Sequence, residues 1–116
     1  MRVIVCGGRK YNNATRLYSI LGKLHRERGI DLVIQGGATG ADTLAARWAV
    51  ANDVSTTTYA ADWGAHGRAA GPKRNQEMLD KEQPDAVVAF PGGNGTADMV
   101  RRAKAAGVPV WEIQPV

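Results

Sequence analysis

Short glycine-rich segments are the part of this sequence best suited to chemistry. Fourteen of the 116 residues are glycine, well above the usual share of roughly 7%. Because glycine has no Cβ, such segments can approach a ligand closely and turn their N–H groups toward an anion. They favour the binding of a phosphate group. The positions that we predict to line this site are Gly7, Gly8, Gly36, Gly37, Thr39, Gly40, Pro91, Gly92, Gly93, Gly95 and Thr96.

Four side chains beside these segments could contact the rest of a ligand. Arg9 and Arg74 stand next to glycine-rich turns, and we predict that they bind phosphate or ribose. Asp42 either caps the helix that it begins or accepts a hydrogen bond from a ribose hydroxyl. Trp63 either stacks on a base or packs as a lid over the sheet edge. The sequence leaves both alternatives open for Asp42 and for Trp63.

Candidates for catalysis are few. Asp98, Asp62 and His66 could take part in acid–base chemistry. Two candidate ligands, Asp62 and His66, do not make a metal site, so we predict no metal. The sequence has neither the dinucleotide fingerprint G-x-G-x-x-G nor the phosphate loop G-x-x-x-x-G-K-[ST], and we predict no resident cofactor. Cys6 is either a thiol activated by the neighbouring glycines or a small buried apolar residue.

The elements that must position these residues alternate between strands and helices. Apolar runs predict strands over 2–6, 30–35, 54–59, 85–90 and 108–113. Four helices are predicted between them. The first is capped by Asn13 and closed by Gly29, the third starts near Pro72 after a long loop over 60–71, and the fourth is capped by Thr96 and stopped by Gly107.

This alternation predicts one α/β domain over 1–116 with a Rossmann-like or flavodoxin-like fold. Its five-stranded parallel sheet would have the strand order 3-2-1-4-5 and helices on both faces. Because the carboxyl ends of parallel strands share one edge, the glycine-rich loops should all open there. The ligand cleft is expected where the strand order reverses, between the strands that end at Cys6 and Phe90.

The composition limits the ligands, the location and the partners that we expect. The formal net charge of +4 is compatible with an anionic ligand and equally with a solvated surface. With a single cysteine, no secretory leader and no apolar run near 18 residues, we expect a cytoplasmic protein without a membrane partner.

Five ordered motifs resemble the SLOG superfamily, most closely its YspA/YpsA-like branch. They are Cys6-Gly7-Gly8-Arg9-Lys10-Tyr11, Gly36-Gly37-Ala38-Thr39-Gly40-Ala41-Asp42, Asp62-Trp63 with His66-Gly67, Ala70-Gly71-Pro72-Lys73-Arg74-Asn75 and Pro91-Gly92-Gly93-Asn94-Gly95-Thr96. The resemblance implies a Rossmann-like module that binds nucleotides or nucleotide-derived ligands, often as a homo-oligomer.

The LOG phosphoribohydrolases of this superfamily carry PGGxGTxxE and an upstream Arg-Lys-x-x-Met. This chain is similar at Arg74 and Met78 but has Asn75 in place of the lysine, and we assign Asn75 to the ligand site. The glutamate position is Met99, and a thioether cannot accept a proton. The resemblance therefore argues against LOG-type cleavage.

Three functions follow as hypotheses. The first is a sensor or sequestering module for a nucleoside phosphate or an ADP-ribose-like molecule. The second is a hydrolase of N-glycosidic or phosphoester bonds that uses Asp98, Asp62 or His66. The third is nucleic-acid binding, for which the sequence has no alternation of aromatic and basic residues.

Overall fold

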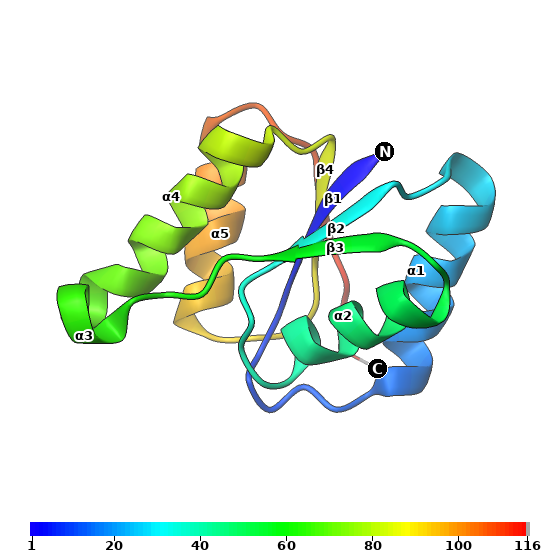
Figure 1. The fold of residues 1–116 in the computed structure, drawn as a ribbon, viewed down its shortest axis with the longest axis horizontal. Coiled ribbons are helices and arrows are strands. Elements are labelled where there is room, and N and C mark those ends of the chain that lie inside the picture. The colour runs from blue at the N-terminus through cyan, green and yellow to red at the C-terminus, as the bar shows by residue number, and fades with distance from the viewer. Residues whose placement is uncertain (116) are drawn as a thin grey trace.

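A computed structural model describes residues 1–115 and contains five parallel strands with helices on both sides (Figure 1). The strand order is β3-β2-β1-β4-β5, which confirms the predicted order and fold class. In chain order the elements are β1 (Arg2–Cys6), α1 (Ala14–Arg28), β2 (Leu32–Gln35), α2 (Ala41–Ala51), β3 (Ser55–Thr58), α3 (Trp63–His66), the 3-10 turn η1 (Gly67–Ala69), α4 (Ala70–Glu82), β4 (Ala86–Ala89), α5 (Asn94–Ala105) and β5 (Val110–Glu112).

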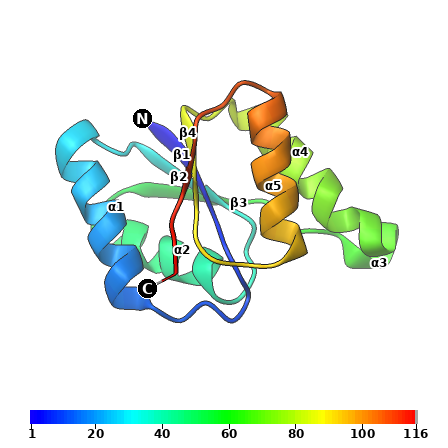
Figure 2. The same cartoon turned by 180° about the vertical axis from the view of Figure 1, so that it is seen from behind.

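The sheet separates two apolar cores. Side chains alternate across a strand, so Val3 and Val5 of β1 pack against α1 and α2, while Ile4 and Cys6 pack against α4 and α5. Figures 1 and 2 show α1 and α2 on one face and α4 and α5 on the other. No helix within residues 1–115 is long and apolar enough to cross a membrane. The central strand β1 therefore contributes side chains to both cores, and its carboxyl end lies at the edge where the glycine-rich loops begin.

Most helix ends follow the predicted signals. The side chain of Asn13 accepts a hydrogen bond from the Arg16 N–H at 3.1 Å, and Gly29 ends α1 with a φ of 73°. The prediction that Thr96 caps the last helix is wrong. Gly93 occupies the cap position and α5 begins at Asn94, so Thr96 lies within the first turn.

The prediction of one long loop over 60–71 is also wrong, because most of this segment is helical. Asp62 caps α3 by accepting a hydrogen bond from the Ala65 N–H at 3.0 Å, and Gly67 ends this short helix with a φ of 55°. The turn η1 then leads into α4, which begins at Ala70 and includes Pro72 in its first turn. The segment after β3 is thus an ordered wall beside the sheet edge, visible at the far end of α4 in Figure 1.

Candidate functional site

A cleft of about 820 Å³ opens at the carboxyl edge of the sheet. The loops after β1, β2 and β4 and the segments α3, α4 and α5 contribute to its walls, as the predicted switch point between β1 and β4 requires. A smaller hollow of about 270 Å³ adjoins it. Of the predicted ligand positions, the main cleft is lined by Gly7, Gly8, Arg9, Gly36, Asp42, Trp63, Arg74, Asn75, Gly93, Gly95 and Thr96. Gly37 and Thr39 line the smaller hollow.

Backbone hydrogen bonds hold three of the loops together. The Gly8 N–H donates to the Pro91 carbonyl at 2.9 Å, and the Gly8 carbonyl accepts from the Ala41 N–H at 3.2 Å. Gly8 therefore joins the loop after β1 to the loop after β4 and to the start of α2. Its N–H is engaged within the protein, although the sequence pattern favoured an N–H directed at the ligand.

Gly40 and Gly92 allow these loops to approach closely. A Cβ on Gly40, whose φ is +80°, would lie 2.2 Å from the Gly8 carbonyl oxygen. A Cβ on Gly92 would lie 2.6 Å from the Gly8 nitrogen and 2.2 Å from the Thr96 Oγ1. Gly40, Gly92 and Pro91 are not among the residues that line either hollow. Their visible role is to pack one loop against another.

Polar side chains fix the loop after β2. The buried Gln35 donates to the Thr58 Oγ1 at 2.6 Å and accepts from the Gly37 N–H at 2.7 Å. The Thr43 hydroxyl donates to the Ala38 carbonyl at 2.8 Å, and the Asp42 Oδ2 accepts from the Ala38 N–H at 3.2 Å. The shape of this loop is thus set before any ligand binds.

Asp42 and Arg74 meet at the floor of the main cleft. Asp42 is only 6% exposed, and burial raises the pKa of its carboxyl group, an effect that the Ala38 N–H, the Arg74 charge and the Gly36 N–H partly offset. Arg74 donates through Nη1 to the carbonyls of Gly36 at 3.0 Å and of Tyr59 at 3.3 Å. A half-buried guanidinium bound to carbonyls of two loops is a fixed positive charge.

Asp98 forms the centre of a polar cluster on the α5 side. Its Oδ1 accepts from the Arg101 Nη2 at 2.6 Å, and its Oδ2 accepts from the Arg102 Nε at 2.8 Å and from the Asn75 Nδ2 at 3.0 Å. Burial alone raises the pKa of Asp98, but the hydrogen bonds from Asn75 and Arg102 and the charges of both arginines lower it below its usual value. Asp98 is therefore an ionised carboxylate with both oxygens engaged.

Asn75 links this cluster to the loop after β4. The side chain is 3% exposed, and its Nδ2 also donates to the Gly95 carbonyl at 3.2 Å. Its Oδ1 accepts from the Arg74 Nε at 3.0 Å. Asn75 thus positions both Arg74 and the start of α5, a role that its sequence neighbours do not reveal.

The N-terminus of α5 opens into the cleft. Asn94, Gly95 and Thr96 are its first three residues, and N–H groups in a first turn have no partner within the helix. Within residues 1–115 these N–H groups and the Thr96 hydroxyl make no hydrogen bond. Together with the helix dipole they form a favourable place for an anion.

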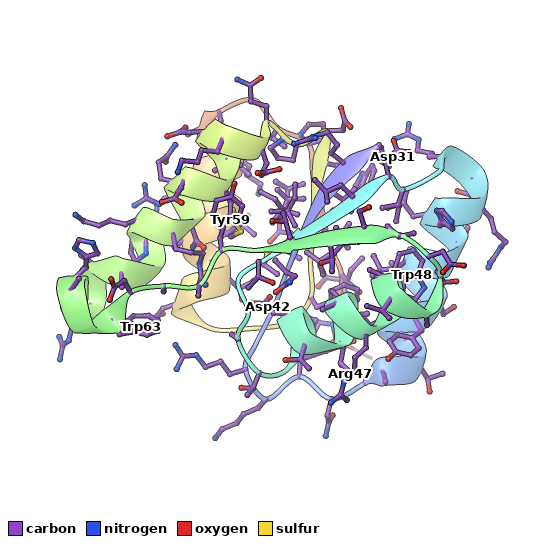
Figure 3. The ribbon with its side chains drawn as sticks, in the orientation of Figure 1. Asp31, Asp42, Arg47, Trp48, Tyr59 and Trp63 are labelled. Carbon is purple, nitrogen blue, oxygen red and sulfur yellow. The ribbon has the colours of Figure 1, made fainter. Side chains whose placement is uncertain are left out.

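Trp63 and Arg9 face each other at the mouth of the cleft. Trp63 is 47% exposed, and the guanidinium carbon of Arg9 lies 5.3 Å from the centroid of its ring. The indole also lies close to Gly71, where a Cβ would come within 3.3 Å of the ring. Figure 3 shows Trp63 beside α3 and Asp42 at the start of α2. Trp63 from α3 and Asp42 from α2 both line the main cleft.

The remaining candidates for catalysis lie away from the cleft lining. Asp62 caps α3, and His66 is exposed at the end of that helix. Within residues 1–115 no three His, Cys, Asp or Glu side chains are grouped to hold a metal ion. Cys6 does line the cleft, but burial raises the pKa of its thiol to about 12. Activation of this thiol, one of the two sequence alternatives, is therefore wrong.

Three basic residues that the sequence analysis did not assign to the ligand site also belong to it. Lys10, Arg68 and Arg101 line the main cleft beside Arg9 and Arg74, so that five basic residues face two acidic ones. The position of Arg101 three residues after Asp98 is a signal that the sequence offers, because such residues are neighbours on a helix. The cleft thus has an excess of positive charge.

Comparisons with known proteins agree with the resemblance drawn from the motifs. Residues 1–66, which include the loops after β1, β2 and β3, match the family described as the YspA, cpYpsA-related SLOG family. Gene 61 protein of Mycobacterium phage D29 is 38% identical to this chain over 117 residues, an alignment that covers 94% of this chain and 93% of that protein. More than half of the chain thus matches the family, and the chain belongs to the YspA, cpYpsA-related SLOG family.

Proposed function

We propose that this protein binds a nucleotide or a nucleotide-derived ligand, such as a nucleoside phosphate or an ADP-ribose-like molecule, as a sensor or sequestering module. Membership of the SLOG family suggests a nucleotide-related Rossmann-like module. The observation that carries the proposal is the cleft itself, which combines a free helix N-terminus, an excess of basic side chains and an exposed indole.

The phosphate is assigned to the start of α5. The N–H groups of Gly95 and Thr96 and the Thr96 hydroxyl supply donors, and Arg101 of the same helix lines the same cleft. Backbone donors and a nearby guanidinium are the usual partners of a phosphate group. The 820 Å³ of the cleft is within the range of about 300–1,000 Å³ typical of small-molecule sites.

Binding is favoured over hydrolysis because Asp98, the candidate base that lines the cleft, is already occupied. Both oxygens of Asp98 accept hydrogen bonds from cationic or amide donors, and a general base needs a free oxygen within reach of the proton it removes. Met99, at the position of the LOG glutamate, is fully buried in the core. We therefore do not propose phosphoribohydrolase activity.

Isothermal titration calorimetry tests the proposal. The panel comprises AMP, ADP, ADP-ribose, ribose 5-phosphate and inorganic phosphate, and we expect binding of at least one nucleotide. Arg9→Ala should weaken binding by about tenfold, the value of one charge-assisted contact. Arg47→Ala is the matched control, because Arg47 is exposed on α2 outside the cleft lining (Figure 3). Absence of heat and of thermal stabilisation across the panel would refute the proposal.

Two further measurements separate the alternatives. Chromatography of AMP incubated with the protein should show no released adenine, whereas release would support the hydrolase. Binding of single-stranded DNA that falls steeply with salt would support nucleic-acid recognition. Light scattering on the same sample measures the homo-oligomer that the family resemblance implies.

A further inference from the structure

We propose that Asp42 and Arg74 recognise the vicinal hydroxyls of a ribose, so that the cleft selects ribonucleotide-derived over deoxyribonucleotide-derived ligands. This inference rests on the proposed function and specifies the sugar of the ligand. It starts from an oddity of the site, namely a buried carboxylate at the floor of a cleft in which basic residues outnumber acidic ones.

One oxygen of Asp42 is committed to the protein and the other is not. Oδ2 accepts from the Ala38 N–H at 3.2 Å. Within residues 1–115, Oδ1 accepts no hydrogen bond from a side chain or a loop N–H. This oxygen is not fully enclosed by the protein. Asp42 also lines the main cleft. A nine-tenths buried carboxylate at the cleft therefore keeps one oxygen without a hydrogen bond from the described residues.

Arg74 places donors beside that acceptor. A Cβ on Gly36 would lie 2.3 Å from the Arg74 Nη1 and 3.0 Å from the Asp42 Oδ2, so both groups converge over the bare Cα of Gly36. Nη1 and Nε of Arg74 are held by Gly36, Tyr59 and Asn75, whereas Nη2 makes no hydrogen bond within residues 1–115. The Asp42 carboxylate and the Arg74 guanidinium are thus neighbours, and each keeps one polar atom without a hydrogen bond from the described residues.

This pair fits a diol better than a phosphate. A carboxylate repels a phosphate group, while a hydroxyl can donate to the carboxylate and accept from the guanidinium through the same oxygen. Two adjacent hydroxyls can use both partners at once. The phosphate is then left to the start of α5, on the opposite side of β1 from α2.

Calorimetry with AMP, 2′-deoxy-AMP and 3′-deoxy-AMP tests the inference. Loss of a hydrogen bond to a charged group should weaken binding of at least one deoxy ligand by about tenfold or more. In Asp42→Asn the amide oxygen can still accept from Ala38, but a donor replaces the free acceptor. The preference for AMP should then fall to about twofold or less. Glu27→Gln, an exposed change on α1, should keep the wild-type preference.

The outcomes are distinct. Equal affinity of the wild-type protein for all three nucleotides would overturn the inference, even if Asp42→Asn failed to fold. An unchanged preference in a folded Asp42→Asn would overturn the role of Asp42. If Asp42 had only a structural role, Asp42→Asn would weaken the binding of all three nucleotides by the same factor, and the ratios of their affinities would not change. If none of the three binds and the wider panel also fails, the proposed function fails instead.

Discussion

Replacement of Gly92 by alanine tests whether glycine is needed here for close packing of the loops. The added Cβ would lie 2.2 Å from the Thr96 Oγ1, 2.6 Å from the Gly8 nitrogen and 3.0 Å from the Gly7 carbonyl carbon. Thr96 can rotate its side chain away. The Gly8 nitrogen cannot move freely, because its N–H donates to the Pro91 carbonyl at 2.9 Å.

The expected loss of stability can be worked from these contacts. Overpacking of this kind costs about 1–3 kcal/mol, and loss of the hydrogen bond from Gly8 to Pro91 adds about 1 kcal/mol. We therefore expect Gly92→Ala to lower the free energy of unfolding by about 2–4 kcal/mol. For a chain of this size that corresponds to a fall of roughly 10 °C in melting temperature.

Urea denaturation and a thermal melt followed by circular dichroism measure the loss. Gly95→Ala is the matched control, because a Cβ on Gly95 meets nothing within 4 Å and alanine in a helix is favoured over glycine by about 0.5–1 kcal/mol. Adding Thr96→Ala to Gly92→Ala should restore only part of the stability, since the clash with Gly8 persists. If Gly92→Ala melts within about 2 °C of Gly95→Ala, the packing argument is wrong.

Three more predictions concern individual residues. Gly40→Ala should be at least as damaging as Gly92→Ala, because it combines a φ of +80° with a Cβ 2.2 Å from the Gly8 carbonyl; the same urea titration measures it. Asp98→Asn should lower stability at pH 7 by about 1.5–3 kcal/mol. Since the folded pKa of Asp98 lies below its ordinary value of 3.8, this stabilisation is present above that value and is lost as the pH falls through the folded pKa. Unfolding at pH 7 and pH 2.5 checks it, and an equal difference at both would contradict the assignment. Cys6, with a pKa of about 12, should not react with Ellman's reagent at pH 8 until the protein unfolds.

The order of the strands could be predicted because it depends on features that are local in the sequence. Each strand is a short apolar or β-branched run, as at Arg2–Cys6, and each is followed by a helical pattern with its own end signal, such as Asn13 or Gly29. Right-handed crossovers then restrict the arrangement. Helix α3 escaped prediction because four residues are too few to show periodicity, although Asp62 three residues before the donating Ala65 is a recognisable cap.

The location of the candidate site could be predicted from the sequence, but the contacts of its individual residues could not. Glycine at positions 40 and 92 looks the same in sequence as glycine at 93 and 95, yet the first two are needed for packing between loops and the last two are open to solvent. The difference depends on atoms that are far away in the chain, such as Gly8. The role of Asn75 depends likewise on Asp98, which is 23 residues away.

The way Gly8 joins the loops has a consequence for how this fold can diverge. The bonds from Gly8 to Pro91 and from Ala41 to Gly8 use main-chain atoms alone. The frame of the cleft therefore does not depend on the side chains at its rim, and residues such as Arg9, Lys10 and Arg68 can be exchanged without dismantling it. Such a scaffold can acquire a different specificity through single substitutions while the neighbouring loops keep their shape, which makes it a practical starting point for engineering new receptors.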